Sequence, residues 1–327
     1  MTYQRLLGRS GIRISALGMG CWAIGGPLWD GSEPLGWGEV DDNESIRAIH
    51  CALEQGITFF DTANNYGAGH SERVLGKALS GRRDDVVIAT KFFNLFDEDT
   101  RQVKGGSAEP ASIRSACEDS LRRLNTDFID LYQFHDNGHP ADKAAPVLNT
   151  LEELVNEGKI RAYGWSTDFP DRAEVFAQGP NCTAIQFQLN VLEDNAPMVT
   201  LCEKHNLAAI NRGPLAMGLL TGKYTTSTRP GADDVRGEKS PVWLKYFKGG
   251  KPNPDFLAKV QAVREILTQD GRTLSQGALT WLWARSGATI PIPGFRTVAQ
   301  VEENSRVLEL GPLPADQFAE VESIMER

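Results

Sequence analysis

Two hydrophobic patterns alternate along the chain. Short runs of branched and aromatic residues, typical of buried strands, occur at 16–22, 57–61, 86–91, 128–135, 160–166, 184–188, 207–211 and 288–292. Stretches with apolar residues three or four positions apart, typical of helices, lie between most of them, at about 42–56, 71–79, 110–124, 145–157, 171–178, 194–205, 254–269 and 274–285. This alternation over roughly 250 residues or more predicts an α/β fold of the (β/α)8 TIM barrel type, with a doubly wound sheet as the alternative.

The ends and the longer connections complete the prediction. Residues 3–16 are typical of an N-terminal β-hairpin, and no linker divides the chain, so residues 1–327 are expected to form a single domain. Long loops at 23–38, 92–109 and 221–253 are expected at the C-terminal face, where they would form a substrate pocket. Four aromatic residues of the last loop either line that pocket or anchor the loop: Tyr224, Trp243, Tyr246 and Phe247.

Composition narrows the class of protein. The net charge is −9 and the pI about 5.2, which disfavours a nucleic-acid-binding surface but leaves room for a local site for an anionic cofactor. The five cysteines include no Cys-x-x-Cys pair, which indicates reduced thiols. No apolar run reaches the roughly 20 residues of a membrane span. We therefore expect a cytoplasmic protein without a membrane partner; the pattern does not determine its oligomeric state.

Four side chains with acid–base chemistry follow three of the predicted strands. Asp61 ends the second strand and Tyr66 lies in the loop beyond it, while Lys91 and His135 end the third and fourth. The C-terminal ends of barrel strands open on one face, so these residues are expected to meet. An ammonium group beside a phenol lowers the pKa of the phenol, and a carboxylate would hold the ammonium group in place. With an imidazole to orient a substrate oxygen, they make a proton donor for a carbonyl.

The same residues carry a resemblance to a known family. Phe-Asp-Thr-Ala-Asn-Asn-Tyr-Gly at 60–67, Ala-Thr-Lys at 89–91 and Gln-Phe-His at 133–135 resemble motifs of the aldo-keto reductases. The resemblance implies that the hairpin plugs the bottom of the barrel. It also implies NADP(H)-dependent reduction of an aldehyde or ketone to an alcohol, with Tyr66 as proton donor, Lys91 lowering its pKa, Asp61 pairing with Lys91 and His135 orienting the carbonyl. The alternative function is a cofactor-binding regulatory subunit, because some relatives associate with channels.

The resemblance further implies a cofactor site. Ser166 and Gln186 would hold the nicotinamide carboxamide, although Thr167 stands where Asn usually follows the Ser. A Gly-containing loop would cover the pyrophosphate through Arg212, Gly213, Pro214, Leu215, Gly218 and Lys223. The adenosine end would be bound by Gly294, Arg296, Gln300, Glu303 and Asn304, with Arg296 favouring the 2′-phosphate of NADP. The remaining residues expected beside the cofactor are Gly20, Cys21, Trp22 and Asp61, and Trp22 is also a candidate wall of the substrate site.

A further departure from the family pattern and one alternative kind of site affect the prediction. Arg212 replaces the aromatic residue that usually stacks on the nicotinamide ring, a role that a planar guanidinium can also fill. His135 and His139 are four positions apart, which suits metal binding only on a helix, and the residues between them are poor helix formers. No metal is therefore expected.

Overall fold

Eight parallel strands form the centre of the protein. The structure, a computed structural model, describes residues 3–327. In chain order the strands are β3 (Gly18–Gly20), β6 (Phe59–Asp61), β7 (Val87–Phe92), β10 (Ile129–Phe134), β11 (Ile160–Ser166), β12 (Cys182–Gln188), β13 (Ala208–Arg212) and β16 (Thr289–Pro291). Their spatial order is β16-β13-β12-β11-β10-β7-β6-β3. The Gly20 amide donates to the Pro293 carbonyl at 2.9 Å, which brings the first strand beside the segment that follows the last. The predicted barrel is thus confirmed.

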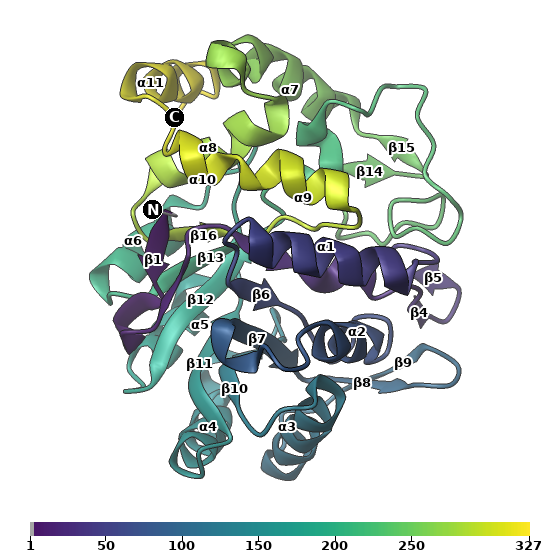
Figure 1. The fold of residues 1–327 in the computed structure, drawn as a ribbon, viewed down its shortest axis with the longest axis vertical. Coiled ribbons are helices and arrows are strands. Elements are labelled where there is room, and N and C mark those ends of the chain that lie inside the picture. The colour runs from purple at the N-terminus through teal and green to yellow at the C-terminus, as the bar shows by residue number, and fades with distance from the viewer. Residues whose placement is uncertain (1–2) are drawn as a thin grey trace.

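Helices surround this barrel (Figure 1). They are α1 (Asp42–Glu54), α2 (His70–Ala78), α3 (Pro110–Leu124), α4 (Ala145–Asn156), α5 (Pro170–Ala177), α6 (Ala196–Lys204), α7 (Pro254–Leu267), α8 (Leu274–Arg285), α9 (Val298–Ser305), α10 (Val307–Leu310) and α11 (Ala315–Ile324). Their starts follow from local chemistry: the Asp41 side chain accepts from the amides of Asn43 and Glu44 at the start of α1. None of the helices within residues 3–327 combines the length and apolar content needed to cross a membrane.

The N-terminal hairpin closes one end of the barrel, as predicted. Strands β1 (Gln4–Leu6) and β2 (Arg13–Ser15) pair antiparallel. Leu7 and Ile14 pack into the apolar interior of the barrel. Arg9 donates to the carbonyls of Cys182 at 2.8 Å and Ala177 at 2.9 Å. Because Cys182 begins β12, the plug lies at the N-terminal end of the strands and leaves the opposite end free.

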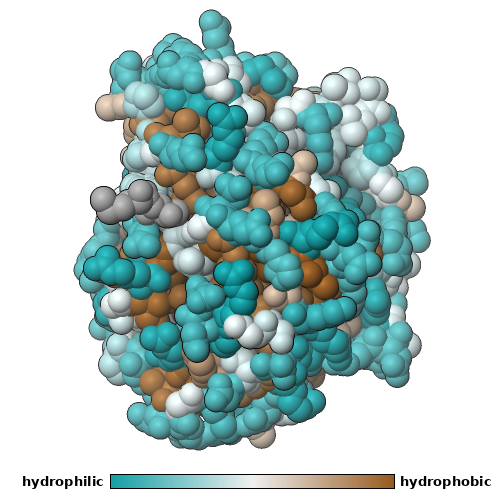
Figure 2. All heavy atoms as spheres, viewed as in Figure 1, coloured by the Kyte–Doolittle hydropathy of each residue, from teal (hydrophilic) through white to brown (hydrophobic). Residues whose placement is uncertain are grey.

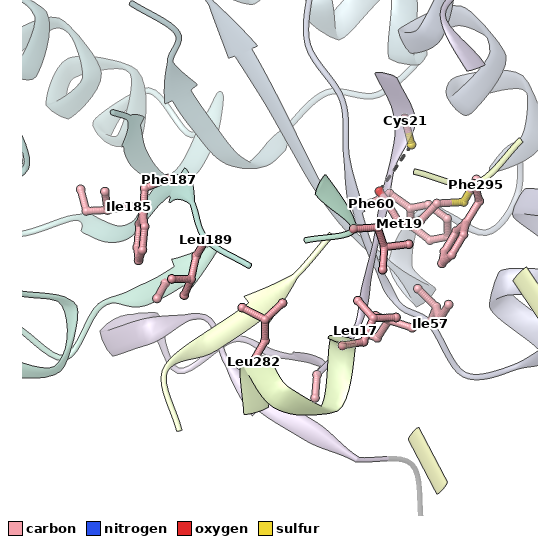
Figure 3. Close-up of a cluster of buried hydrophobic side chains, with 14 of the residues drawn as sticks. Leu17, Met19, Cys21, Ile57, Phe60, Ile185, Phe187, Leu189, Leu282 and Phe295 are labelled. Carbon is pink, nitrogen blue, oxygen red and sulfur yellow. Dashed lines mark hydrogen bonds between the residues drawn. The ribbon is translucent and has the colours of Figure 1, made fainter. Parts of the chain in front are cut away.

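The strands bury side chains on both faces, and this produces two cores. Their outward residues pack against the helices; Figure 3 shows Phe60, Ile185 and Phe187 among these side chains. The inward residues form a smaller core inside the barrel. At the C-terminal ends the inward series turns polar: Phe59 is followed by Asp61, and Ala89 by Lys91. This change of polarity builds the site, because each polar residue lies two positions beyond an apolar one on the same face.

The connections differ most from the prediction. The loops at 23–38 and 92–109 share a four-stranded sheet of β5 (Glu33–Pro34), β4 (Trp29–Asp30), β9 (Gln102–Gly106) and β8 (Asn94–Asp97). The loop at 221–253 contains a small hairpin of β14 (Phe247–Lys248) and β15 (Lys251–Pro252). These strands are short, and the pairing of β4 with β9 joins segments far apart in the chain, so periodicity does not reveal them. The surface that Figure 2 shows is largely hydrophilic, with apolar residues scattered between polar ones.

Candidate active site

Four predicted side chains meet at the open end of the barrel. The Lys91 ammonium group donates to Asp61 Oδ1 at 2.5 Å, to the Thr62 carbonyl at 2.8 Å and to the Tyr66 hydroxyl at 3.2 Å. The rings of Tyr66 and His135 lie edge to face, with centroids 6.1 Å apart. Lys91 and Asp61 are almost entirely buried. The structure therefore brings together a carboxylate, an ammonium group, a phenol and an imidazole that are far apart in sequence.

Two glutamines, which the sequence reasoning did not place in this cluster, complete it. Gln133 and Gln186 donate to Asp61 Oδ2 at 2.9 and 2.8 Å. Both face inward from β10 and β12, two positions beyond apolar inner residues. Because Asp61 accepts from three side chains, its position is fixed, and so is the position of Lys91. The sequence could have indicated Gln133, because it lies two positions before His135 and therefore on the same face of the strand.

The electrostatics agree with the prediction in part. Burial has the largest effect on the pKa of Tyr66 and, together with the charge of Asp61, raises it above its usual value of 10; Lys91 and Arg212 lower it by less than these two raise it. The expectation of an unusually acidic phenol is therefore wrong for this structure, although Lys91 acts in the predicted direction. Burial disfavours the charged form of Lys91, but Asp61 and Tyr66 together outweigh burial and raise the pKa of the ammonium group. Lys91 thus stays positively charged beside a protonated phenol.

His135 is neutral, and a neighbouring amide determines its tautomer. Burial, followed by the charges of Lys91 and Arg212, holds the pKa of His135 well below 6.5. Asn94 Nδ2 lies 3.4 Å from His135 Nδ1. An amide nitrogen only donates, so Nδ1 accepts and the ring proton is on Nε2. His135 is therefore a hydrogen-bond donor. Asn94 was not predicted, because it begins the short strand β8, which the sequence pattern did not reveal.

A cavity of about 900 Å³ opens above these residues. Most predicted site residues line it: Gly20, Cys21, Trp22, Asp61, Tyr66, His135, Ser166, Gln186, Arg212, Gly213, Pro214, Leu215, Gly218, Lys223, Gly294, Arg296 and Gln300. Lys91 is buried behind Tyr66, and the lining does not include Glu303 or Asn304, which lie on α9. The side-chain oxygen of Asn304 is buried and has no hydrogen-bond partner within residues 3–327.

One end of the cavity is positively charged. Lys223, Arg236 and Arg296 line it, and burial followed by the charges of Arg236 and Arg296 lowers the pKa of Lys223. Arg296 donates to the backbone carbonyls of Trp37 at 3.2 Å and Glu39 at 2.7 Å. Arg236 was not predicted; it lies in the long loop after β13, pairs with Asp234 and lies over the Trp37 ring at 4.4 Å. Three cations around one hollow favour an anionic group such as a phosphate.

The wall between this end and Tyr66 is polar. Gln186 and Ser166 line it, but the Gln186 amide nitrogen is already bound by Asp61. Thr167 is fully buried, and its hydroxyl accepts from the Phe169 amide, so it does not replace an asparagine in the cavity. Arg212 donates to Gln188 Oε1 at 3.2 Å and forms an ion pair with Asp168.

Aromatic residues surround the remaining part. Trp22 stacks on the Tyr66 ring with centroids 6.0 Å apart. Trp243 and Tyr246 line the cavity, although Tyr246 is itself buried; Tyr224 and Phe247 are buried and do not belong to the lining. The long loop therefore uses its aromatic residues in both of the predicted ways.

Within residues 3–327 no three His, Cys, Asp or Glu side chains converge in a way that could hold a metal ion. His139 Nδ1 contacts the Asp136 carboxylate at 3.5 Å instead. The site is an acid–base cluster beside a hollow lined by cations, at the C-terminal face of a parallel barrel, where barrel enzymes place their chemistry.

Comparisons with known proteins agree with this class. The model of the Aldo/keto reductase family matches residues 16–326. An aldo-keto reductase of Bacillus subtilis, YhdN, is 34% identical over 305 residues, which cover 91% of this chain and 86% of that protein. The glycerol dehydrogenase structure from Gluconobacter oxydans is 32% identical with a TM-score of 0.82, covering 99% of this chain and 95% of the other. The chain therefore belongs to the aldo/keto reductase family and is an oxidoreductase.

A more distant structure shares the fold. It is an aldo/keto reductase from Klebsiella pneumoniae in complex with NADP and acetate, 23% identical with a TM-score of 0.73, and it covers 99% of this chain and 96% of its own.

Proposed function

We propose that this protein reduces an aldehyde or ketone to an alcohol with NADPH, and that Tyr66 donates the proton. The observation that carries the proposal is the contact of the Tyr66 hydroxyl with the buried Lys91 ammonium group at 3.2 Å, on the wall of a cavity large enough for a nucleotide and a small substrate.

The residues present fit a phosphorylated dinucleotide. Lys223, Arg236 and Arg296 line the hollow, and the ion pair with Asp234 compensates the charge of Arg236. At Gly294 an added Cβ would meet nothing closer than Ala23 Cβ at 3.4 Å, so the backbone there is open to a ligand. We infer that the pyrophosphate and the 2′-phosphate bind here. The fold relative from Klebsiella pneumoniae was solved with NADP, which is consistent with this assignment.

Bound NADPH would supply the hydride to the carbonyl carbon. The Tyr66 hydroxyl then gives its proton to the carbonyl oxygen, and Lys91 stabilises the phenolate that remains. His135 donates from Nε2 to the same oxygen and orients it. Asp61 keeps Lys91 charged and in place. Trp22, which stacks on Tyr66, forms the apolar wall beside the substrate.

The state of Tyr66 favours reduction over oxidation. A phenol with a raised pKa is protonated throughout the neutral range, as an acid must be. Oxidation of an alcohol needs the phenolate. We therefore expect alcohol oxidation to be slow at neutral pH and to accelerate as the pH rises.

The test is Tyr66→Phe, with Tyr132→Phe as a matched control. The Tyr132 hydroxyl is buried without a hydrogen-bond partner within residues 3–327, so its removal leaves the site intact. Tyr66→Phe should lower kcat by about 10²–10⁴-fold, the usual contribution of general acid catalysis, while NADPH still binds in a fluorescence titration. Near-normal turnover in Tyr66→Phe would refute the role of Tyr66. A wild-type protein that bound NADPH but reduced no aldehyde, ketone or sugar would favour the regulatory-subunit alternative.

A further inference from the structure

Arg212 lies at the rim of the barrel, at the C-terminal end of strand β13. Ile210, two positions earlier, points into the inner core. In the sheet Arg212 lies beside Gln188 of β12, while Gln186 lies beside Ser166 of β11. Three adjacent strands therefore present one wall, made of Ser166, Gln186 and the Arg212 guanidinium, to the cavity that contains Tyr66 and His135.

The charge of Arg212 shifts the pKa values of His135 and Tyr66. Together with Lys91 it disfavours protonation of His135, and it also lowers the pKa of Tyr66, although less than burial raises it. Asp168 pairs with Arg212, yet Asp168 is not among the charges that act on His135. Asp168 lines the same cavity as Arg212, but only the guanidinium is among the charges that shift the pKa values of His135 and Tyr66.

The neighbouring charges are balanced without Arg212. Lys91 is paired with Asp61. Towards the mouth, Glu193 pairs with Lys245 and Asp194 with Arg285. Asp168 also accepts from the Gln188 amide at 2.8 Å and from Asn137 at 3.3 Å, and these neutral donors hold its carboxylate in place beside Arg212. Arg212 thus lines the cavity as the positive half of an ion pair with Asp168, and its charge acts on the pKa values of Tyr66 and His135.

We propose that Arg212 makes this site distinguish the oxidation states of its cofactor, favouring neutral reduced nicotinamide over the cationic oxidised ring. This inference rests on the proposed function. The phosphates and adenosine are the same in NADPH and NADP⁺, and only the ring gains a positive charge when the hydride leaves. The ring must lie within reach of a carbonyl held by Tyr66 and His135, which places it beside the Arg212 wall. A guanidinium there repels the oxidised ring selectively.

The experiment compares dissociation constants of NADPH and NADP⁺, followed by protein tryptophan fluorescence at fixed ionic strength. Arg212→Gln removes the charge and keeps a planar amide, and Arg212→Lys keeps the charge. Lys223→Gln is the control at the phosphate end. The wild type should bind NADPH more tightly, and Arg212→Gln should reduce the ratio of the two constants about tenfold, which corresponds to about 1.4 kcal/mol. Arg212→Lys should retain most of the ratio, and Lys223→Gln should weaken both forms equally.

A fourth variant tests the same idea in the opposite direction. Asp168→Asn keeps an oxygen for the Gln188 amide but removes the counter-charge of Arg212, so the preference for NADPH should increase. This prediction stands even if Arg212→Gln fails to fold. Equal weakening of both cofactors by Arg212→Gln, or an unchanged ratio in Asp168→Asn, would overturn the inference while leaving the reductase function intact. A wild-type protein that bound neither cofactor would refute the proposed function itself.

Discussion

The ion pair between Asp61 and Lys91 gives the sharpest test of the site. Asp61→Asn keeps the shape of the side chain and one oxygen acceptor but removes the negative charge. Lys91 is fully buried and donates to Asp61 Oδ1 at 2.5 Å, so the substitution leaves an ammonium group in the barrel without its counter-ion. The amide nitrogen that the substitution introduces would also face Gln133 and Gln186, which donate to Asp61 Oδ2.

The expected cost follows from these contacts. Two unit charges 2.5 Å apart interact by about 6–7 kcal/mol at an effective dielectric constant of about 20. Relaxation and partial loss of the proton from Lys91 reduce this cost, so the free energy of unfolding should fall by about 3–5 kcal/mol, as when one partner of a buried pair is removed. Turnover should fall as well, because a neutral Lys91 no longer stabilises the Tyr66 phenolate.

A double-mutant cycle with Lys91→Met provides the control, because Met keeps the length of the side chain without its charge. Each single variant should lose about 3–5 kcal/mol in urea denaturation, and the double variant should lose at least about 2 kcal/mol less than the sum of the two. Additive losses would show that Asp61 and Lys91 do not depend on one another. Wild-type stability of Asp61→Asn would contradict the buried ion pair altogether.

Three further predictions follow from the structure. Burial, Lys91 and Arg212 hold the pKa of His135 well below 6.5, so below that pH the unfolded chain binds a proton that the folded protein does not. The free energy of unfolding should therefore fall as the pH drops below 6.5, by at most about 1.4 kcal/mol per pH unit. In denaturant titrations His135→Gln should make this fall shallower. Gly67→Ala should lower the free energy of unfolding by at least about 2 kcal/mol, because the added Cβ would lie 1.7 Å from the Gly25 carbonyl oxygen. Gly31→Ala, which has open space around it, should cost about 1 kcal/mol. Equal shifts of the melting temperature in the two variants would contradict this. Trp243→Ala should change the free energy of unfolding by less than about 0.5 kcal/mol, because Trp243 is 59% exposed. Because Trp243 lines the cavity, the same variant should raise the KM of the carbonyl substrate. An unchanged KM across a substrate panel would place Trp243 outside the substrate site.

The sequence was sufficient to predict the barrel and the four acid–base residues for one physical reason. Strand ends are visible where branched and aromatic runs stop, and parallel strands open on one face, so Asp61, Lys91 and His135 could be placed together without coordinates. The same parity also places Gln133 in the cluster, but an amide inside a strand has no chemical signal of its own. Its role became visible only from its contact with Asp61.

Residues supplied by loops were predictable only in part. Asn94 reaches His135 because Phe93, at φ +122°, turns the chain away from the end of β7, a backbone conformation that the sequence does not reveal. Arg236 reaches the hollow lined by cations because the Val235 amide donates to the Gly36 carbonyl at 2.7 Å, which joins loops about two hundred residues apart. Contacts of this kind depend on tertiary packing, which local patterns do not contain.

The wrong prediction for Tyr66 shows which influence on a pKa cannot be seen in the sequence. Charges can be read from a chain, so the lowering effect of Lys91 on the phenol was foreseeable. Burial cannot be read in the same way, and here burial and the charge of Asp61 together outweigh the lysine and raise the pKa of Tyr66. Lys91 therefore does not make the phenol acidic before the substrate arrives. Its charge acts as negative charge develops on Tyr66, so the barrel holds an acid in its protonated form and stabilises the product of its ionisation.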